Sequence, residues 1–134
     1  MQPNFIDKLA WIEIKDRSIL STRSFGKDKY YIPGGNRENG ETDALALCRE
    51  IREELCIEIS SNSMQLTGIF KAQAHGHPEG TLVQMTCYTA GYTGELKAAS
   101  EIEEIKWLSH ADKDKISEVD KLIFDYLKEK ELLD

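Results

Sequence analysis

The sequence predicts an α/β fold in which a mixed β-sheet is sandwiched between helices. Strand-like segments surround one central amphipathic helix and precede a second helix at the C-terminus. The 134 residues, 40% of them hydrophobic and 31% charged, suffice for one hydrophobic core and have the balance of a globular protein. We therefore expect residues 1–134 to form a single domain.

The N-terminal part is predicted to be a β-hairpin followed by a short strand. Residues 6–14 are apolar with β-branched and aromatic side chains, Asp16 and Arg17 interrupt them, and residues 18–22 resume the pattern. A polar loop then leads to a short strand at residues 30–32. Side chains alternate along a strand, so one of its two tyrosines should face the core and the other should face outward.

The central helix is predicted to follow a turn at the Pro-Gly-Gly sequence of residues 33–35, because proline fixes φ and glycine tolerates positive φ. Thr42 or Asp43 is the expected N-cap, and the helix should end near Cys56. Apolar residues recur with helical spacing and predict a core-facing stripe of Ala44, Leu47, Cys48, Ile51 and Leu55.

The second half of the chain is predicted to contain strands at residues 57–59, 64–73, 81–90 and 102–108. Trp11 and Trp107 lie in apolar strands and are assigned to the core. A final helix at residues 117–132 carries an apolar stripe of Val119, Leu122, Ile123, Tyr126 and Leu127.

Charge and composition exclude several classes of protein. The net charge of -7, without a strong Lys/Arg run, argues against binding to nucleic-acid polymers. No apolar run reaches the ~20 residues that span a bilayer, and the N-terminus lacks the order of a signal peptide, so we expect a cytoplasmic protein without membrane contact. The cysteines Cys48, Cys56 and Cys87 match neither a disulfide framework nor a CxxC metal site and are expected to be reduced.

Three glutamates of the central helix indicate a metal site. Glu50, Glu53 and Glu54 are spaced i, i+3 and i+4, so their carboxylates project from one face, beside the apolar stripe and not within it. Like charges this close repel unless a hard divalent cation such as Mg²⁺ lies among them. Arg49 is placed to orient a neighbouring carboxylate, and Glu41 has a capping or orienting role. A solvated helix face is the alternative interpretation.

These residues and their spacing resemble the signature of the Nudix hydrolase superfamily, G-x5-E-x7-R-E-U-x-E-E-x-G-U, in which U is aliphatic. The second glycine of the signature is replaced by Cys56, where a left-handed conformation costs a residue with a Cβ roughly 1 kcal/mol. This signature, called the Nudix box, spans residues 35–57. Its positions are filled in register by Gly35, Glu41, Arg49, Glu50, Ile51, Glu53, Glu54 and Ile57.

The resemblance implies an α/β/α sandwich and an enzyme that hydrolyses a nucleoside diphosphate linked to another group. Water would attack phosphorus with the help of Mg²⁺, or alternatively Mn²⁺. Carried over by position, Glu50, Glu53 and Glu54 would bind the metal and act in catalysis together with Arg49, and the Gly35 carbonyl would add a ligand. Either Glu50 or Glu54 would take the proton from the attacking water.

Residues outside the box complete the predicted site. Members of the family often use an additional acidic residue, for which we choose Glu101, with an ordinary charged strand edge as the alternative. Asp120 lies at the beginning of the last predicted helix. Its two alternative interpretations are a contact to the nucleobase and a charge that stabilises the helix N-terminus. The predicted substrate-binding residues are Arg23, Lys29, Tyr31, Gly34 and His75.

The predicted activity is cleavage of a nucleoside triphosphate to the monophosphate and pyrophosphate. The short chain resembles the MutT-like branch of the superfamily, which catalyses this reaction. The alternatives are an ADP-ribose or nucleotide-sugar pyrophosphatase and, in another class, a non-catalytic nucleotide sensor; the intact box glutamates favour catalysis. The expected partner is a small nucleotide, and a homodimer is left open.

Overall fold

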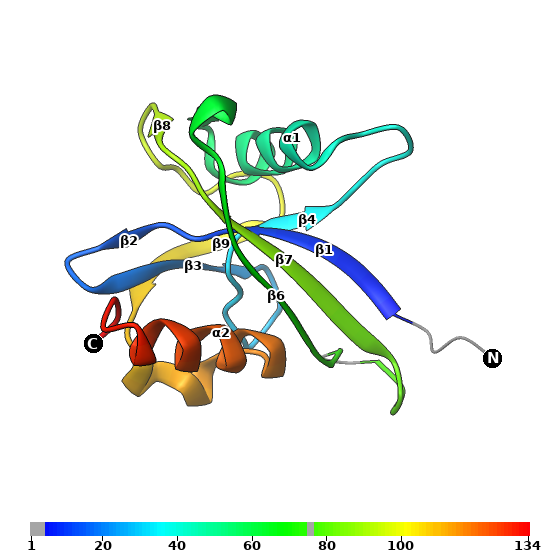
Figure 1. The fold of residues 1–134 in the computed structure, drawn as a ribbon, viewed down its shortest axis with the longest axis vertical. Helices are drawn as coiled ribbons and strands as arrows, with labels where there is room; N and C mark the ends of the chain where they lie inside the picture. Colours follow the sequence, from blue (N-terminus) through cyan, green and yellow to red (C-terminus); the bar gives the residue numbers. More distant parts are fainter. Residues whose placement is uncertain (1–4, 75–76) are drawn as a thin grey trace.

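The computed structural model describes residues 5–74 and 77–134, and its two helices lie on opposite sides of the β-strands (Figure 1). Short 3₁₀ segments follow β5 and β9 at Ser61–Ser63 and His110–Lys115. The strands are β1 (Phe5–Trp11), β2 (Ile14–Lys15), β3 (Ser18–Ser24), β4 (Gly34–Asn36), β5 (Glu58–Ile59), β6 (Gln65–Gln73), β7 (Leu82–Thr89), β8 (Tyr92–Thr93) and β9 (Ile102–Leu108), and the helices are α1 (Asp43–Leu55) and α2 (Glu118–Glu129).

The main sheet is mixed, as predicted. It has the strand order β4-β1-β7-β6, in which β1 runs parallel to β7 while the other two pairs are antiparallel. A second, antiparallel sheet has the order β2-β3-β9, and β5 pairs with β8. Helices on both sides of a mixed sheet confirm the predicted α/β class.

The Pro-Gly-Gly segment differs from the prediction. Instead of forming a turn, Gly34–Asn36 is strand β4, paired antiparallel with β1. A Cβ built on Gly34 would lie 1.9 Å from the Leu9 carbonyl oxygen, so glycine permits this close approach of two backbones. The predicted strand at residues 30–32 is reduced to single bridges of Tyr30 and Tyr31, because the chain there passes between sheets.

The N-terminal hairpin is confirmed, with changed bounds. Asp16 and Arg17 form its turn with φ values of 52° and 63°, and β2 pairs with β3 as expected. The first strand stops at Trp11 instead of residue 14, because the chain leaves the main sheet there and Ile14 pairs with Ile19 in the second sheet.

Helix α1 begins and ends where the sequence indicated. The Thr42 hydroxyl accepts a hydrogen bond from the Leu45 amide at 3.2 Å, which makes Thr42 the N-cap. Cys56 ends the helix in the left-handed conformation, with φ 61° and ψ 28°. Of the predicted stripe, Leu47, Ile51 and Leu55 are buried while Ala44 and Cys48 are half-buried.

Helix α2 is rotated relative to its predicted stripe. Val119, Ile123 and Leu127 are buried as expected, but Leu122 is 43% exposed. Asp120 and Phe124 are buried instead. They are spaced i, i+4, and each directly follows a buried residue of the predicted stripe, so the buried face extends to their side of the helix. The buried face of this helix therefore includes a carboxylate.

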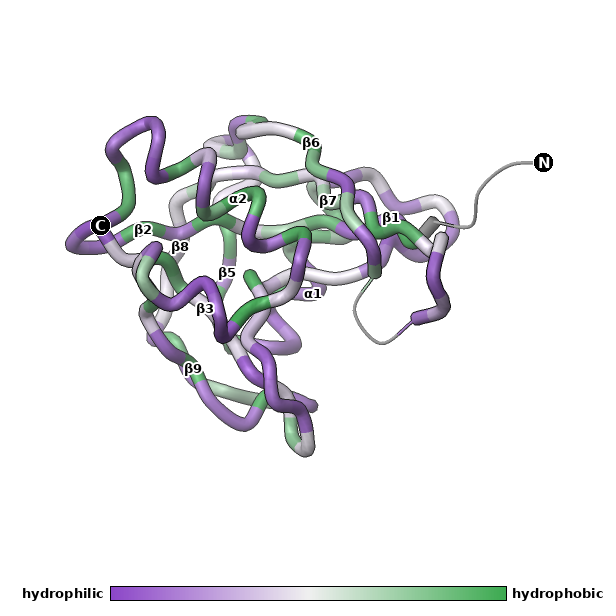
Figure 2. The backbone as a smooth tube through the Cα atoms, turned by 90° about the horizontal axis from the view of Figure 1, so that it is seen from below, coloured by the Kyte–Doolittle hydropathy of each residue, from purple (hydrophilic) through white to green (hydrophobic). Residues whose placement is uncertain are grey.

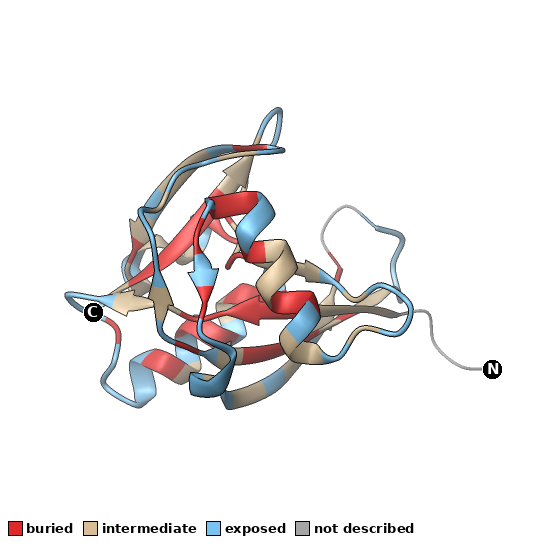
Figure 3. Ribbon diagram, turned by 90° about the horizontal axis from the view of Figure 1, so that it is seen from above, coloured by how far each residue is buried: buried red, intermediate tan, exposed pale blue. Residues whose placement is uncertain are grey.

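The sheet separates two hydrophobic cores, and β1 contributes to both. Leu9 and Trp11 join the core beneath α1, whereas Ala10 and Ile12 join the core beneath α2. Trp11 is fully buried and donates from Nε1 to the Ala90 carbonyl at 3.1 Å, which confirms its predicted place. Hydrophobic residues gather along the strands (Figure 2), and buried residues line the sheet and the inner sides of the helices (Figure 3).

Within residues 5–74 and 77–134, neither helix has the length and hydrophobicity required to cross a membrane.

Candidate active site

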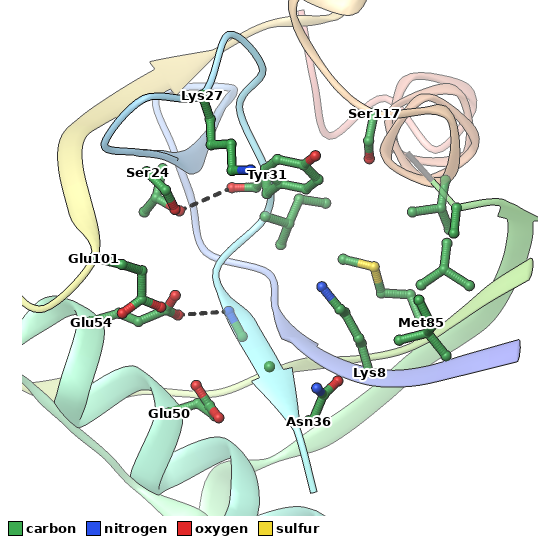
Figure 4. Close-up of a pocket in the computed structure, with 18 of the residues that line it drawn as sticks. Lys8, Ser24, Lys27, Tyr31, Asn36, Glu50, Glu54, Met85, Glu101 and Ser117 are labelled. Carbon is green, nitrogen blue, oxygen red and sulfur yellow. Dashed lines mark hydrogen bonds between the residues drawn. The ribbon is translucent and has the colours of Figure 1, made fainter. Parts of the chain in front are cut away.

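One large pocket brings the box residues together with the open part of the main sheet. It has a volume of about 720 Å³, which is within the usual range for small-molecule sites. We call the part formed by Glu50, Glu54 and Glu101 the carboxylate end. We call the opposite part, formed by the buried side chains of Ile32, Val83, Met85 and Val119, the apolar end (Figure 4).

Strand β4 brings its glycine backbone directly against α1. A Cβ built on Gly35 would lie 2.4 Å from the Glu50 carboxyl carbon, so any larger residue would displace Glu50. The pKa of Glu50 is raised chiefly by burial, against the opposing effect of the Arg49 guanidinium. The first glycine of the box is therefore required by the position of a carboxylate.

Glu54 is the most buried of the box glutamates, with 6% of its surface exposed. The Gly34 amide donates to its Oε1 at 3.1 Å. Burial raises the pKa of Glu54 to about 8, and the like charges of Glu101 and Glu50 act in the same direction. Glu54 thus belongs to the buried face of α1, whereas the sequence placed it beside that face.

Arg49 orients two glutamates, in agreement with the role expected for it. Its Nε and Nη2 donate to the two carboxylate oxygens of Glu41 at 2.8 and 2.9 Å, a bidentate contact. Its Nη1 donates to Glu50 at 3.0 Å and its Nη2 to the Asn36 carbonyl at 3.0 Å. The Arg49 hydrogen bonds hold the pKa of Glu41 at about 2. Arg49 therefore ties the helix start, the helix and β4 together.

Of the two remaining glutamates predicted to bind metal, one lines the pocket and the other lies outside it. Glu101 lines the pocket and points toward Glu54 (Figure 4). Glu53 is exposed outside the pocket lining, and its nearest ionic contact is Arg49 at 3.6 Å. Among the described residues, no three acidic, histidine or cysteine side chains are already arranged to hold an ion.

The donor chemistry of the carboxylate end nevertheless fits a hard divalent cation. Its side chains are oxygen donors, which Mg²⁺ and Mn²⁺ prefer. Burial and mutual repulsion disfavour the ionised form of Glu54, and a bound cation would relieve both effects.

The predicted substrate-binding residues lie in different places. Tyr31 and Gly34 line the pocket. The Arg23 guanidinium lies outside it and donates to Glu103 at 2.6 Å, and the Lys29 ammonium donates to the Asp114 carbonyl at 2.8 Å. His75 lies outside the described residues.

Lys8 and Ser117 are among the pocket residues that were not predicted as site residues from the sequence. Lys8 projects from β1 into the pocket between its two ends, and Ser117 faces the apolar end from the start of α2 (Figure 4). The sequence did carry a signal for Lys8, because it is the charged member of the otherwise apolar row of Ile6, Ala10 and Ile12. Ser117 had no distinguishing pattern.

Asp120 lies behind the pocket wall and is fully buried. Its Oδ2 accepts a hydrogen bond from the Ile32 amide at 3.2 Å, and burial raises its pKa to about 7. Within the described part of the chain, Asp120 Oδ1 and Ser117 Oγ are buried and form no hydrogen bond of standard geometry, but the Ser117 hydroxyl lies close enough to lower the pKa of Asp120.

Comparison with known protein families gives one match, in which the model of the NUDIX domain covers residues 9–127. This range begins in β1, ends in α2 and includes the whole box. A comparison with curated protein sequences finds no match.

Solved structures share the fold. The E. coli ORF135 protein has a TM-score of 0.73 at 23% sequence identity, covering 94% of this chain and 92% of that chain. The MutT protein from Methanosarcina mazei Go1 has a TM-score of 0.77 at 16% identity, covering 98% of both chains. A MutT NUDIX hydrolase from Burkholderia pseudomallei has a TM-score of 0.72 at 20% identity, covering 91% and 97%.

Proposed function

The chain belongs to the NUDIX domain family and is a pyrophosphohydrolase of nucleoside diphosphate derivatives, and we propose that it cleaves nucleoside triphosphates to monophosphates and pyrophosphate with Mg²⁺. The observation that carries the proposal is the pocket itself. It joins a carboxylate end to an apolar end within about 720 Å³, which suits a ligand with phosphates at one side and a flat base at the other.

At the carboxylate end, Glu50, Glu54 and Glu101 would hold the cation, with Glu53 and the Gly35 carbonyl as the further ligands that the family resemblance implies. When bound, the ion supplies neutralisation of phosphate charge and a lowered pKa for a water molecule. The protein's own part is positional. Arg49 holds Glu50 through Nη1 at 3.0 Å, and the Gly34 amide holds Glu54 at 3.1 Å.

At the other end, the apolar side chains and the Tyr31 ring support binding of a nucleobase. Ile32, Val83 and Met85 are buried and line this part of the pocket, so a planar base would cover them.

The test is the release of pyrophosphate and orthophosphate from a panel of phosphate compounds in the presence of Mg²⁺. The panel contains the nucleoside triphosphates, oxidised nucleotides, ADP-ribose, nucleotide sugars and dinucleoside polyphosphates. We expect pyrophosphate from the triphosphates. Glu54→Gln and Glu53→Gln should each lower kcat on the order of a hundredfold, and Glu129→Gln on the exposed side of α2 should leave it unchanged.

Two results would contradict the proposal. Faster turnover of ADP-ribose or a nucleotide sugar would assign a different substrate to the same site. Full activity in both glutamine variants, or no turnover of any nucleoside diphosphate derivative, would overturn the enzymatic role of the carboxylate end.

A further inference from the structure

Lys8 is a cation at an apolar position of the main sheet. It lies in β1 on the face that carries Ala10 and Ile12 in the core beneath α2, and it pairs across the sheet with Met85. An ammonium group at such a position loses hydration, and it stabilises the protein less than an apolar side chain of similar length unless it finds a counter-charge. Packing within this apolar row therefore gives no reason for a lysine here.

No described residue places a counter-charge in contact with Lys8. Among the described residues, no hydrogen bond and no ion pair within 4 Å involves its ammonium group, in contrast to Arg23, Arg37 and Arg49, which are all bonded to carboxylates. Its side chain instead extends into the pocket (Figure 4). Lys8 is thus available to a ligand.

The position of Lys8 indicates which part of a bound nucleotide it would contact. It lies between the carboxylate end and the apolar end (Figure 4), and its charge acts on both Glu54 and Asp120. A nucleotide is linear, with its polyphosphate, sugar and base in that order. If the outer phosphates lie with the cation and the base lies at the apolar end, the phosphate attached to the sugar lies beside Lys8.

We propose that Lys8 binds the phosphate group that remains on the nucleoside, by donating from Nζ to one of its non-bridging oxygens. This rests on the proposed function, because it assumes that a nucleotide occupies the pocket in this direction. A charge-assisted hydrogen bond of this kind is among the stronger polar contacts in proteins. It would favour binding of the substrate and of the monophosphate product alike.

The test is product binding without metal, measured by calorimetry in EDTA. AMP, GMP, CMP and UMP are compared with the corresponding nucleosides for the wild type, Lys8→Met, Lys8→Arg and the control Lys128→Met, whose lysine is exposed on α2. Lys8→Met should weaken the best monophosphate about tenfold, the size of one charged hydrogen bond, and leave its nucleoside unchanged. Lys8→Arg should restore most of the affinity, and Lys128→Met should behave as wild type.

The thermal midpoint separates this role from a structural one. Methionine has a similar length and suits the apolar row, so Lys8→Met should melt at the same temperature as the wild type or higher. A lower midpoint that Lys8→Arg restores would make Lys8 a structural residue and overturn the proposal.

Three binding results would also overturn it. Equal weakening of monophosphate and nucleoside would assign Lys8 to the base or sugar, unchanged binding of both would leave it solvated, and a wild type without preference for the monophosphate would exclude the contact. The substrate panel is independent of these measurements. Turnover of triphosphates with no effect of Lys8→Met on binding refutes only this inference, whereas absence of turnover refutes the proposed function.

Discussion

At the scale of single residues, the site depends on two glycines. At each of them, another group occupies the space that a Cβ atom would fill. The Leu9 carbonyl occupies the space beside Gly34, and the Glu50 carboxylate occupies the space beside Gly35. One glycine thus joins β4 to the sheet, and the other admits the Glu50 carboxylate. The same pair of residues reads in the sequence as a turn, because close approach and turn formation require the same absence of Cβ.

The buried Asp120 predicts a pH dependence of stability. Its pKa is about 7 in the folded protein against an ordinary value of 3.8. The folded state therefore binds more protons between these values, and stability falls as pH rises from about 4 to 7. Asparagine keeps an acceptor for the Ile32 amide but does not titrate. Between pH 5 and 8, the unfolding free energy of Asp120→Asn relative to wild type should rise by about 3 kcal/mol, at about 1.4 kcal/mol per pH unit below pH 7 and with little further change above it.

Urea denaturation at pH 5, 6, 7 and 8 measures this difference. The cost of burying the new amide group changes the unfolding free energy by the same amount at every pH. The informative quantity is therefore the dependence of the free-energy difference on pH. Asp114→Asn, at an exposed aspartate, serves as the control and should give a flat difference. A flat difference for Asp120→Asn would show that this carboxylate is not desolvated.

At the scale of elements, α1 carries a core stripe, a bound arginine network and a strained end. Its last residue, Cys56, is in the left-handed region with φ 61°, and its amide donates to the Arg52 carbonyl at 3.0 Å. This geometry normally uses glycine. The sequence predicted the strain from the departure at this position, and the backbone conformation agrees.

Replacing Cys56 by glycine should stabilise the protein. The left-handed conformation costs a residue with a Cβ about 1 kcal/mol, and the greater freedom of glycine in the unfolded chain returns part of the gain. The net effect is about 0.5 kcal/mol, or roughly 2 °C in Tm. Cys56→Ala keeps the Cβ and removes the exposed thiol, so its Tm should equal that of the wild type. If Cys56→Gly melts at or below the wild-type temperature, the strain is absent.

At the scale of the whole molecule, β1 couples the two cores. Leu9 and Trp11 are buried on one face of the sheet, and Ala10 and Ile12 on the other. Neither core can lose its packing while the shared strand stays in place, so the two should unfold in one transition. The pocket is lined by residues of α1 and by residues at the start of α2, so it adjoins both sides of this strand.

Phe124→Leu tests this coupling. Phe124 is a residue of α2 and is fully buried in the core on that side of the sheet. Trp11 is fully buried in the other core, beneath α1. The substitution should cost about 1 kcal/mol and lower the midpoints of tryptophan fluorescence and far-UV circular dichroism by the same amount. Leu122→Ala, at an exposed position of the same helix, should change both midpoints little. Fluorescence and dichroism midpoints that separate in Phe124→Leu would mean that the cores unfold independently.

Local patterns were sufficient for the elements and for the chemical identity of the box. Spacing of apolar residues located the hairpin and both helices, and the glutamates at i, i+3 and i+4 indicated metal chemistry, because these features depend on residues close together in the chain. The cap at Thr42 and the left-handed Cys56 follow from the same short range. Glu54 was also found, but its burial was not.

Tertiary structure decided what depends on residues far apart in the chain. The pairing of β4 with β1 converted a predicted turn into a strand and placed the Gly34 amide on Glu54. The same packing left Arg23 bonded to Glu103 and brought Lys8 into the pocket. Strand pairing is set by contacts across the whole chain, and no local pattern reports which side chains meet there. The sequence by itself determined the reaction class, and the tertiary structure decided which side chains line the pocket where it would occur.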